Sequence, residues 1–161
     1  MTLANRRGWW IWAGLVSRLV VGVVWVVAGV LKLPDPALSV RAVRAYRLLP
    51  EAVVPAVGYG LPVLEVAIGL LLIVGLGTRV VAALSAVLFL AFIVGIASAW
   101  ARGLQIDCGC FGGGGFRADA TAQYPWEIAR DVGLLALSVA LVVRPRSALS
   151  LDDRLLLREE V

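Results

Sequence analysis

Hydrophobic and polar positions divide the chain into four long apolar segments with short polar connections between them. Runs of about 20 apolar residues are long enough to cross the hydrocarbon core of a bilayer, which is about 30 Å thick. We therefore expect an all-α membrane protein, with residues 1–145 forming a four-transmembrane-helix bundle and residues 146–161 forming a cytoplasmic tail. The predicted spans are residues 10–31, 55–75, 80–100 and 126–143.

The connections between these segments differ in length and character. Residues 75–79, GLGTR, are short enough for a tight turn that joins the second and third segments into an antiparallel hairpin. The first connection is longer, and between Pro34 and Pro50 its apolar and arginine residues recur at helical spacing. This pattern predicts a short amphipathic interfacial helix between the first and second spans. A solvated basic loop is the alternative.

Composition agrees with a membrane protein. Of the 161 residues, 61% are hydrophobic and 16% are charged, whereas a soluble domain of this size needs more polar residues to cover its surface. The chain has no histidine, which excludes histidine-based metal sites and histidine acid–base catalysis. The net charge of +4 does not gather into a basic stripe, so we expect no nucleic-acid partner.

The distribution of arginine and lysine predicts an orientation. Four spans put both termini on one side, and basic residues are slightly more frequent on that side, as is typical of the cytoplasmic face. A thiol pair is also more often oxidised outside the cytosol. We therefore expect a multi-pass protein of the cell membrane (inner or plasma membrane), surrounded by lipid. Its termini would be cytoplasmic and its cysteine-containing loop, residues 102–125, would be extracytoplasmic.

Charged residues occur inside the apolar segments, where an unpaired charge is costly. At a rise of about 1.5 Å per residue, Arg18 and Glu65 have similar predicted depths, so we expect them to pair between adjacent helices. This pair would be structural, form the polar floor of a ligand pocket, or relay protons. In the fourth segment Glu127, Arg130 and Asp131 share one side of the first turns, where Arg130 can pair with Glu127. This pattern favours helix capping and interfacial anchoring. The alternative is that Asp131, the deeper of the two acids, faces the interior beneath the cysteines.

Both cysteines lie in the segment DCGCFGGGGF, residues 107–116. A bridge between Cys108 and Cys110 would close a very small ring, so it would stabilise the fold only weakly. Its strained geometry would also make it easy to reduce. The pattern therefore favours a redox pair. An ordinary buried pair, a structural disulfide and a two-coordinate Cu(I) site are the alternatives, whereas zinc would need about four ligands.

Glycines surround the two thiols. Glycine between the cysteines can adopt the dihedral angles that a tight ring demands. We expect the run after Cys110 to let the loop move between the membrane and an external partner. The glycines concerned are Gly109, Gly112, Gly113, Gly114 and Gly115.

Three segments carry a family resemblance: residues 29–36, GVLKLPDP; residues 61–65, LPVLE; and residues 102–112, which begin with RG and end with DCGCFG. On these segments the chain resembles the MauE branch of the DoxX-like family of small four-helix membrane proteins. The resemblance covers about residues 15–140, and the cysteine segment is its most specific part.

The resemblance implies a redox-associated membrane protein. MauE proteins are linked to the maturation of methylamine dehydrogenase, a disulfide-rich enzyme of methylamine utilisation, outside the cytosol, and they often accompany a thioredoxin-like partner. Wider DoxX relatives are linked to quinone-coupled sulfur oxidation. By position, Cys108 and Cys110 would be the redox pair, and Arg18, Lys32 and Glu65 would be motif residues without an assigned role.

We therefore expect a membrane thiol–disulfide oxidoreductase that exchanges electrons with a thioredoxin-like partner. Quinone is a candidate cofactor. Membrane thiol oxidants of this size commonly use two cysteine pairs, so either a partner supplies the second pair or the single pair reacts directly with quinone. Two other functions are kept as alternatives: a non-enzymatic anchor or assembly subunit of a redox complex, and a carrier of lipid or another small molecule.

Overall fold

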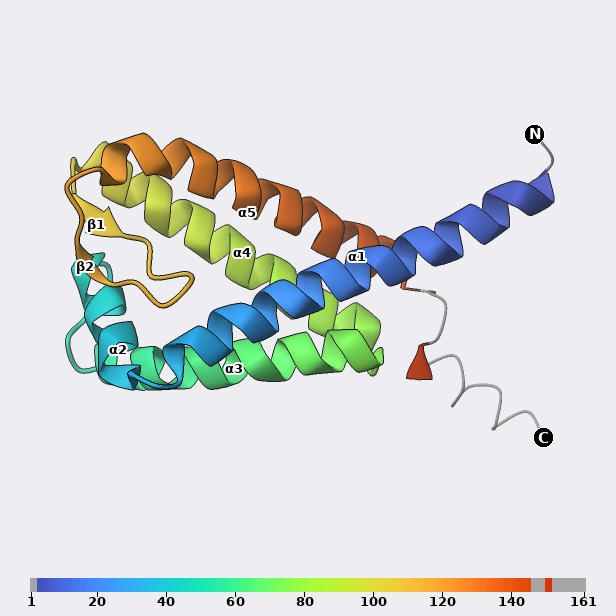
Figure 1. Ribbon diagram of the computed structural model, residues 1–161, viewed down its shortest axis with the longest axis horizontal. Coiled ribbons are helices and arrows are strands. Elements are labelled where there is room, and N and C mark those ends of the chain that lie inside the picture. Colours follow the sequence, from blue (N-terminus) through green and yellow to red (C-terminus); the bar gives the residue numbers. More distant parts are fainter. Residues whose placement is uncertain (1–2, 146–149, 152–161) are drawn as a thin grey trace.

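The computed structural model describes residues 3–145 and 150–151. These residues form a mainly helical protein with one small hairpin of two-residue strands (Figure 1). The tail predicted over residues 146–161 lies, apart from residues 150 and 151, outside the described residues. In chain order the elements are α1 (Leu3–Lys32), α2 (Pro36–Ala45), α3 (Val54–Val74), α4 (Thr78–Ala101), β1 (Ile106–Asp107), β2 (Gly115–Phe116) and α5 (Ala120–Val143).

Three of the four predicted spans coincide with helices that are long and apolar enough to cross a membrane. These spans are Trp9–Lys32 in α1, Val54–Val74 in α3 and Thr78–Ala101 in α4. The fourth long helix, α5, has the same 24-residue length as α4. It contains three charged residues, Glu127, Arg130 and Asp131, which is more than any of the three candidate spans contains. A fourth span therefore stays a prediction.

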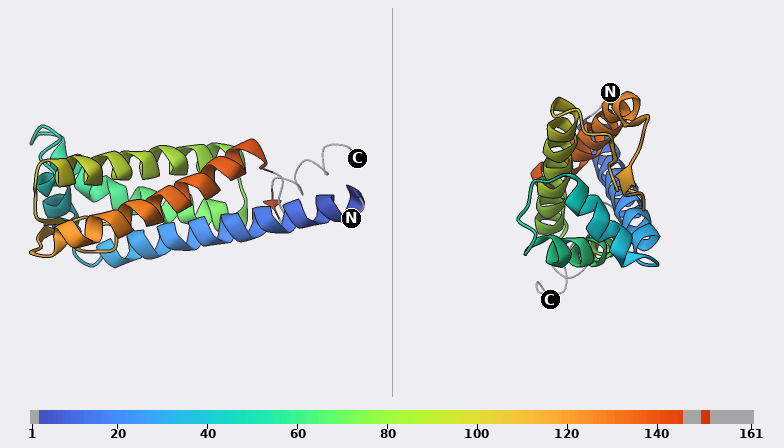
Figure 2. Two further views of the ribbon diagram at one scale, coloured as in Figure 1. Left: turned by 90° about the horizontal axis from the view of Figure 1, so that it is seen from above. Right: turned by 90° about the vertical axis from the view of Figure 1, so that its left-hand side faces the viewer.

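The long helices lie side by side and form what we call the helical body (Figure 2). In this body α1 packs mainly on α3, and α4 packs mainly on α5. Glycines set the distance between α1 and α3: a side chain added at Gly29 would approach the Pro62 carbonyl oxygen to 2.7 Å, and one at Gly22 the Gly69 carbonyl oxygen to 2.9 Å. The backbones of the two helices are therefore in close contact, as small residues permit between membrane helices.

The middle of the helical body contains a cluster of aromatic side chains and a series of hydrogen-bonded polar side chains. Trp25 is 1% exposed, and its ring centroid lies 4.5 Å from that of Phe89. Its indole nitrogen donates a 2.7 Å hydrogen bond to Ser85, whose hydroxyl lies 3.1 Å from that of Ser138. These contacts tie α1, α4 and α5 together, and they satisfy polar groups that would otherwise be costly in an apolar interior.

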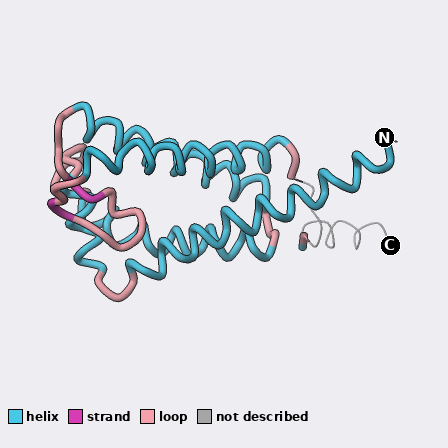
Figure 3. Tube along the Cα trace, turned by 45° about the horizontal axis from the view of Figure 1, so that its top comes forward, coloured by secondary structure: helices cyan, strands magenta, loops and turns pink. Residues whose placement is uncertain are grey.

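The two ends of the helical body differ. At the turn end, Gly75 (φ +76°) and Gly77 (φ +60°) form the predicted tight turn between α3 and α4. The start of α1 lies at this end, and the Ser150 hydroxyl donates to the Gly75 carbonyl over 2.9 Å (Figure 1). The loop end carries α2, the β1–β2 hairpin and most of the loops (Figure 3).

Helix α2 lies where the sequence predicts a short amphipathic helix. Pro36 is at its start, and the Asp35 carboxylate caps it by accepting a 3.1 Å hydrogen bond from the Leu38 backbone amide. One face of α2 is buried at Ser39, Val40 and Ala42. The helix itself is thus observed, and its position at a membrane interface stays a prediction.

Candidate functional site

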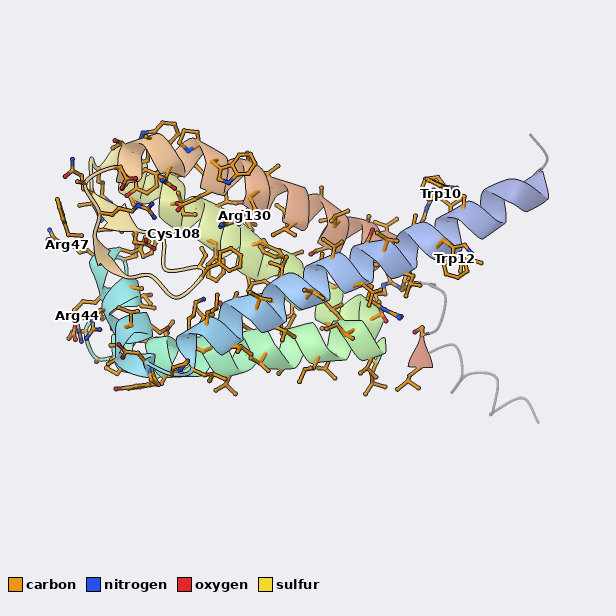
Figure 4. All side chains as sticks on the ribbon, viewed as in Figure 1. Trp10, Trp12, Arg44, Arg47, Cys108 and Arg130 are labelled. Atoms are coloured by element: carbon orange, nitrogen blue, oxygen red, sulfur yellow. The ribbon has the colours of Figure 1, made fainter. Side chains whose placement is uncertain are left out.

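Both cysteines lie in the segment between β1 and β2, and Figure 4 shows Cys108 at the loop end. They are free thiols in this structure. Cys110 is 8% exposed and Cys108 is partly exposed. The Cys110 backbone amide donates to the Cys108 sulfur over 3.4 Å. The structure therefore describes the reduced pair, and the predicted bridge stays a prediction.

Hydrogen bonds from three elements hold the cysteine segment in place. The Asp107 carboxylate accepts from the Gly109 amide at 2.9 Å and from the Arg117 guanidinium at 3.1 Å. Tyr46 follows α2, and its hydroxyl donates to the Cys108 carbonyl oxygen over 3.0 Å. From α5, the Tyr124 hydroxyl accepts from the Ile106 amide at 3.2 Å. Burial raises the pKa of Tyr46, so this residue stays a hydrogen-bond donor.

The glycines let this segment pack closely on α2. Gly109 has φ +69°, and a Cβ atom there would lie 2.6 Å from that of Ala42. A side chain at Gly113 would collide with the Asp107 carboxylate. Gly112 and Gly114 are similarly close to the end of α1 and to α2, whereas Gly115 has open space. Close packing is thus one reason for the run, and the predicted movement of the loop stays a prediction.

Three charged residues of α5 lie beneath the thiols. The Arg130 guanidinium pairs with Asp131, with 2.9 Å between Nε and Oδ1, so the predicted pairing of Arg130 with Glu127 is wrong. The guanidinium also lies over the Phe111 ring, 4.9 Å from its centroid, as a cation–π contact. Asp131 is 2% exposed and borders a small cavity together with Cys110.

Glu127 lies at the other thiol. Its side chain is buried and lies close enough to Cys108 for the two groups to interact. Within residues 3–145 and 150–151, Glu127 Oε2 and Asp131 Oδ2 are buried and have no hydrogen-bond partner. Each thiol therefore has a carboxylate beside it with an oxygen able to accept a proton. The sequence indicates only helix capping and a pairing with Arg130 for Glu127, because nothing in it shows which loop covers this residue.

The environment of the two sulfurs differs. Hydrogen bonding to the Cys108 side chain raises the pKa of the Cys110 thiol, and burial and the nearby Cys108 and Asp131 charges raise it further. Since the thiolate is the nucleophile, Cys110 is held in its less reactive form. The more exposed Cys108 is the better placed of the two sulfurs to meet an external disulfide.

A buried ion pair lies further into the helical body, between α1 and α3. Lys32 Nζ and Glu65 Oε1 are 2.6 Å apart, and their side chains are 3% and 0% exposed. The predicted pairing of Arg18 with Glu65 is therefore wrong. Arg18 is 1% exposed and lies against Gly75 at the turn end.

The register between α1 and α3 explains this outcome. A side chain at Gly29 would lie between the Pro62 carbonyl oxygen and the Val66 amide nitrogen, so Gly29 is level with about residue 64 of α3 and Glu65 is level with about residue 28 of α1. That level is about ten residues, or about 15 Å, from Arg18. Lys32 reaches Glu65 because helical side chains point back toward the N-terminus of their own helix. The predicted depths of Arg18 and Glu65 were counted from the ends of their own spans, which does not take this register between α1 and α3 into account.

A cavity of about 280 Å³ connects the ion pair to the thiols. It lies between α2 and the facing sides of α3 and α4, and the cysteine segment closes one side of it. Lys32, Cys108 and Cys110 all border it, while most of its wall is apolar. The apolar wall includes Leu61, Leu88, Ala91 and Phe92.

These features define a multi-pass helical membrane protein with a thiol pair at one end and an apolar cavity beside it. Comparison with known families assigns residues 11–144 to the methylamine utilisation protein MauE. The match covers most of the chain, and the chain belongs to the MauE family. Comparison with curated proteins and with solved structures finds no match.

Proposed function

We propose that this MauE-family protein exchanges thiols and disulfides through Cys108 and Cys110 with a thioredoxin-like protein outside the cytosol. One observation carries the proposal: two adjacent free thiols at the loop end each have a buried carboxylate beside them. A pair that served only for packing would not need charged groups in an otherwise apolar environment.

The exchange proceeds in two steps. The Cys108 thiolate attacks one sulfur of the partner's disulfide, which forms a mixed disulfide and releases the partner's other sulfur as a thiolate. Cys110 then attacks the Cys108 sulfur, which forms the intramolecular bridge and releases the reduced partner. Two electrons and two protons pass to the partner. When the partner arrives as a dithiol, the same steps run in reverse.

The neighbouring carboxylates have distinct tasks in this scheme. Glu127, which interacts with Cys108, accepts the proton of the attacking thiol. Asp131, which borders the same small cavity as Cys110, accepts the proton of the second thiol. Arg130 positions Asp131 through their ion pair and holds the segment through Phe111.

The proposal includes four membrane spans with cytoplasmic termini. Helix α5 has 24 residues, or a length of about 36 Å. Its charged residues Glu127 and Asp131 are buried, while Val132, Val139 and Val143 are exposed as lipid-facing residues would be. An even number of spans would also agree with the start of α1 and Ser150 lying at the same end.

Trapping of the mixed disulfide tests the proposal. A Cys110→Ser variant lacks the second sulfur, so it should retain a thioredoxin-like protein covalently when the proteins are separated without reductant. A Cys108→Ser variant should retain much less, and the double variant none. Mass spectrometry identifies the partner and the linked sulfurs. If neither single variant traps such a protein and the double variant still supports maturation of the partner's substrates, the chain is an anchor or assembly subunit instead.

A further inference from the structure

Three features meet at the cavity beside the thiols. Its wall is mostly apolar, it is bordered by the buried ammonium group of Lys32, and both cysteines reach it. Its volume of about 280 Å³ is near the lower limit of small-molecule sites, about 300 Å³. The space therefore fits a single ring with the first part of a side chain, and it is too small for a protein segment.

The position of the cavity indicates where a ligand comes from. Helices α3 and α4 diverge from the turn at Gly75 toward the loop end (Figure 1), and the cavity lies between their facing sides. On the outer side of α4, Val87, Leu90 and Val94 are exposed, as expected where lipid surrounds a span. Ala91 borders the cavity and is itself exposed on this helix, so a molecule dissolved in the surrounding lipid can approach the cavity from this side.

The polar groups at the wall restrict the chemistry of the ligand. An ammonium group has three N–H donors, and in the described part of the chain the hydrogen bond to Glu65 accounts for one of them. Lys32 can therefore donate to a ligand oxygen as well. Phosphate-bearing cofactors do not fit, because among the described residues Lys32 is the only cation at this wall, and it is already paired with Glu65. A lipid acyl chain would use neither the ammonium group nor the thiols.

We propose that this cavity binds the ring of a membrane-dissolved quinone, whose carbonyl oxygen accepts a hydrogen bond from Lys32 and which oxidises Cys108 and Cys110. In this step two S–H bonds break and one S–S bond forms. The ring takes up the two electrons and two protons and leaves as a hydroquinone. The proposal rests on the exchange function above, and it gives that function a direction, from the partner's dithiol through the cysteine pair to quinone.

A filled cavity tests this proposal. The protein is reduced, returned to lipid nanodiscs without reductant and mixed anaerobically with decylubiquinone. Hydroquinone formation is followed by absorbance, and binding by native mass spectrometry. We expect about one hydroquinone per protein. An Ala91→Trp variant should bind decylubiquinone at least tenfold more weakly, whereas Val94→Trp, on the lipid-exposed side of α4, should behave as the unchanged protein.

A second variant addresses the possibility that Ala91→Trp does not fold. Replacing Lys32 with Met and Glu65 with Leu together removes the donor without leaving a buried charge unpaired. This variant should fold and also lose at least tenfold in decylubiquinone binding. Equal binding by all variants would overturn the proposal, as would a phospholipid in the cavity that decylubiquinone does not displace.

The two proposals fail in different ways. Each variant is also assayed for exchange with a small disulfide, for which Ala91→Trp should match Val94→Trp. If the thiols exchange with the disulfide but never reduce decylubiquinone, the quinone proposal is wrong and the exchange function stands. If the thiols react with neither while decylubiquinone still binds in an Ala91-dependent way, the exchange function is wrong and the proposed oxidation fails with it.

Discussion

Replacing Lys32 with Met should destabilise the protein strongly, because it leaves Glu65 without its ion-pair partner. The two side chains are 3% and 0% exposed, and the nitrogen–oxygen distance is 2.6 Å. Removing one member of a buried pair typically costs about 3–5 kcal/mol, and a charge at the centre of a membrane helix costs a similar amount, about 2.5–3.5 kcal/mol. For a chain of 161 residues, each kcal/mol shifts Tm by about 2–4 °C. The expected decrease in Tm is therefore about 6–20 °C.

The assay is thermal unfolding of the purified protein in one detergent, followed by tryptophan fluorescence and by loss of the monodisperse peak. Arg44→Met is the matched control, since Arg44 pairs with Glu51 in the open, with side chains 48% and 65% exposed. It should leave Tm unchanged. Replacing Lys32 with Met and Glu65 with Leu together should restore most of the loss, because no uncompensated charge is then buried. The reasoning is refuted if Lys32→Met has the same Tm as Arg44→Met, or if the double variant has a lower Tm than Lys32→Met.

Three further outcomes are expected. Gly109→Ala should raise the rate at which maleimide labels Cys108 several-fold. The reason is that Gly109 has φ +69° and lies against Ala42, so an added methyl group would force the segment away from α2. Gly115→Ala should have a smaller effect, because Gly115 has φ +111° but open space around it. Site-resolved alkylation should show Cys110 reacting only well above the ordinary cysteine pKa of about 8.5, because its raised pKa leaves less thiolate at any lower pH. Trp25→Phe should cost about 1 kcal/mol, measured by Tm, because Ser85 loses a buried hydrogen bond.

The sequence predicts the long helices well and their ends less well. Helix α5 begins at Ala120, although the apolar pattern begins only at Trp126. The first turns of α5 are missed because of Pro125, since proline normally lies in the first turn of a helix or breaks its interior. The two-residue strands β1 and β2 carry no periodic signal at all. Hydrophobic periodicity therefore predicts the helices that are surrounded by lipid or by the protein core. It gives no information about the structure of the polar segment that holds the cysteines.

The position of some charged residues can be predicted from their own stretch of sequence, whereas the partner of others depends on how distant helices pack. For Asp131 a position beneath the cysteines was the alternative expectation, because it is the deeper acid of α5, and it borders a cavity with Cys110. Glu65 was assigned the wrong partner because the register of α1 on α3 depends on Gly22 and Gly29 meeting particular backbone atoms. No periodicity encodes that contact. The cavity depends on α2, α3, α4 and the cysteine segment at once, so no single stretch of sequence predicts it.

The position of Cys108 would allow one pair of thiols to serve both proposed reactions. A thiol that meets a protein partner must be reachable from water, and one that meets a bilayer ligand must border an apolar space. Cys108 is partly exposed and also borders the cavity, while Cys110 is buried against it. The close packing of Gly109 on Ala42 holds both sulfurs at this boundary. A second cysteine pair would be needed if the two proposed reactions took place at separate positions, whereas Cys108 is partly exposed and borders the cavity as well.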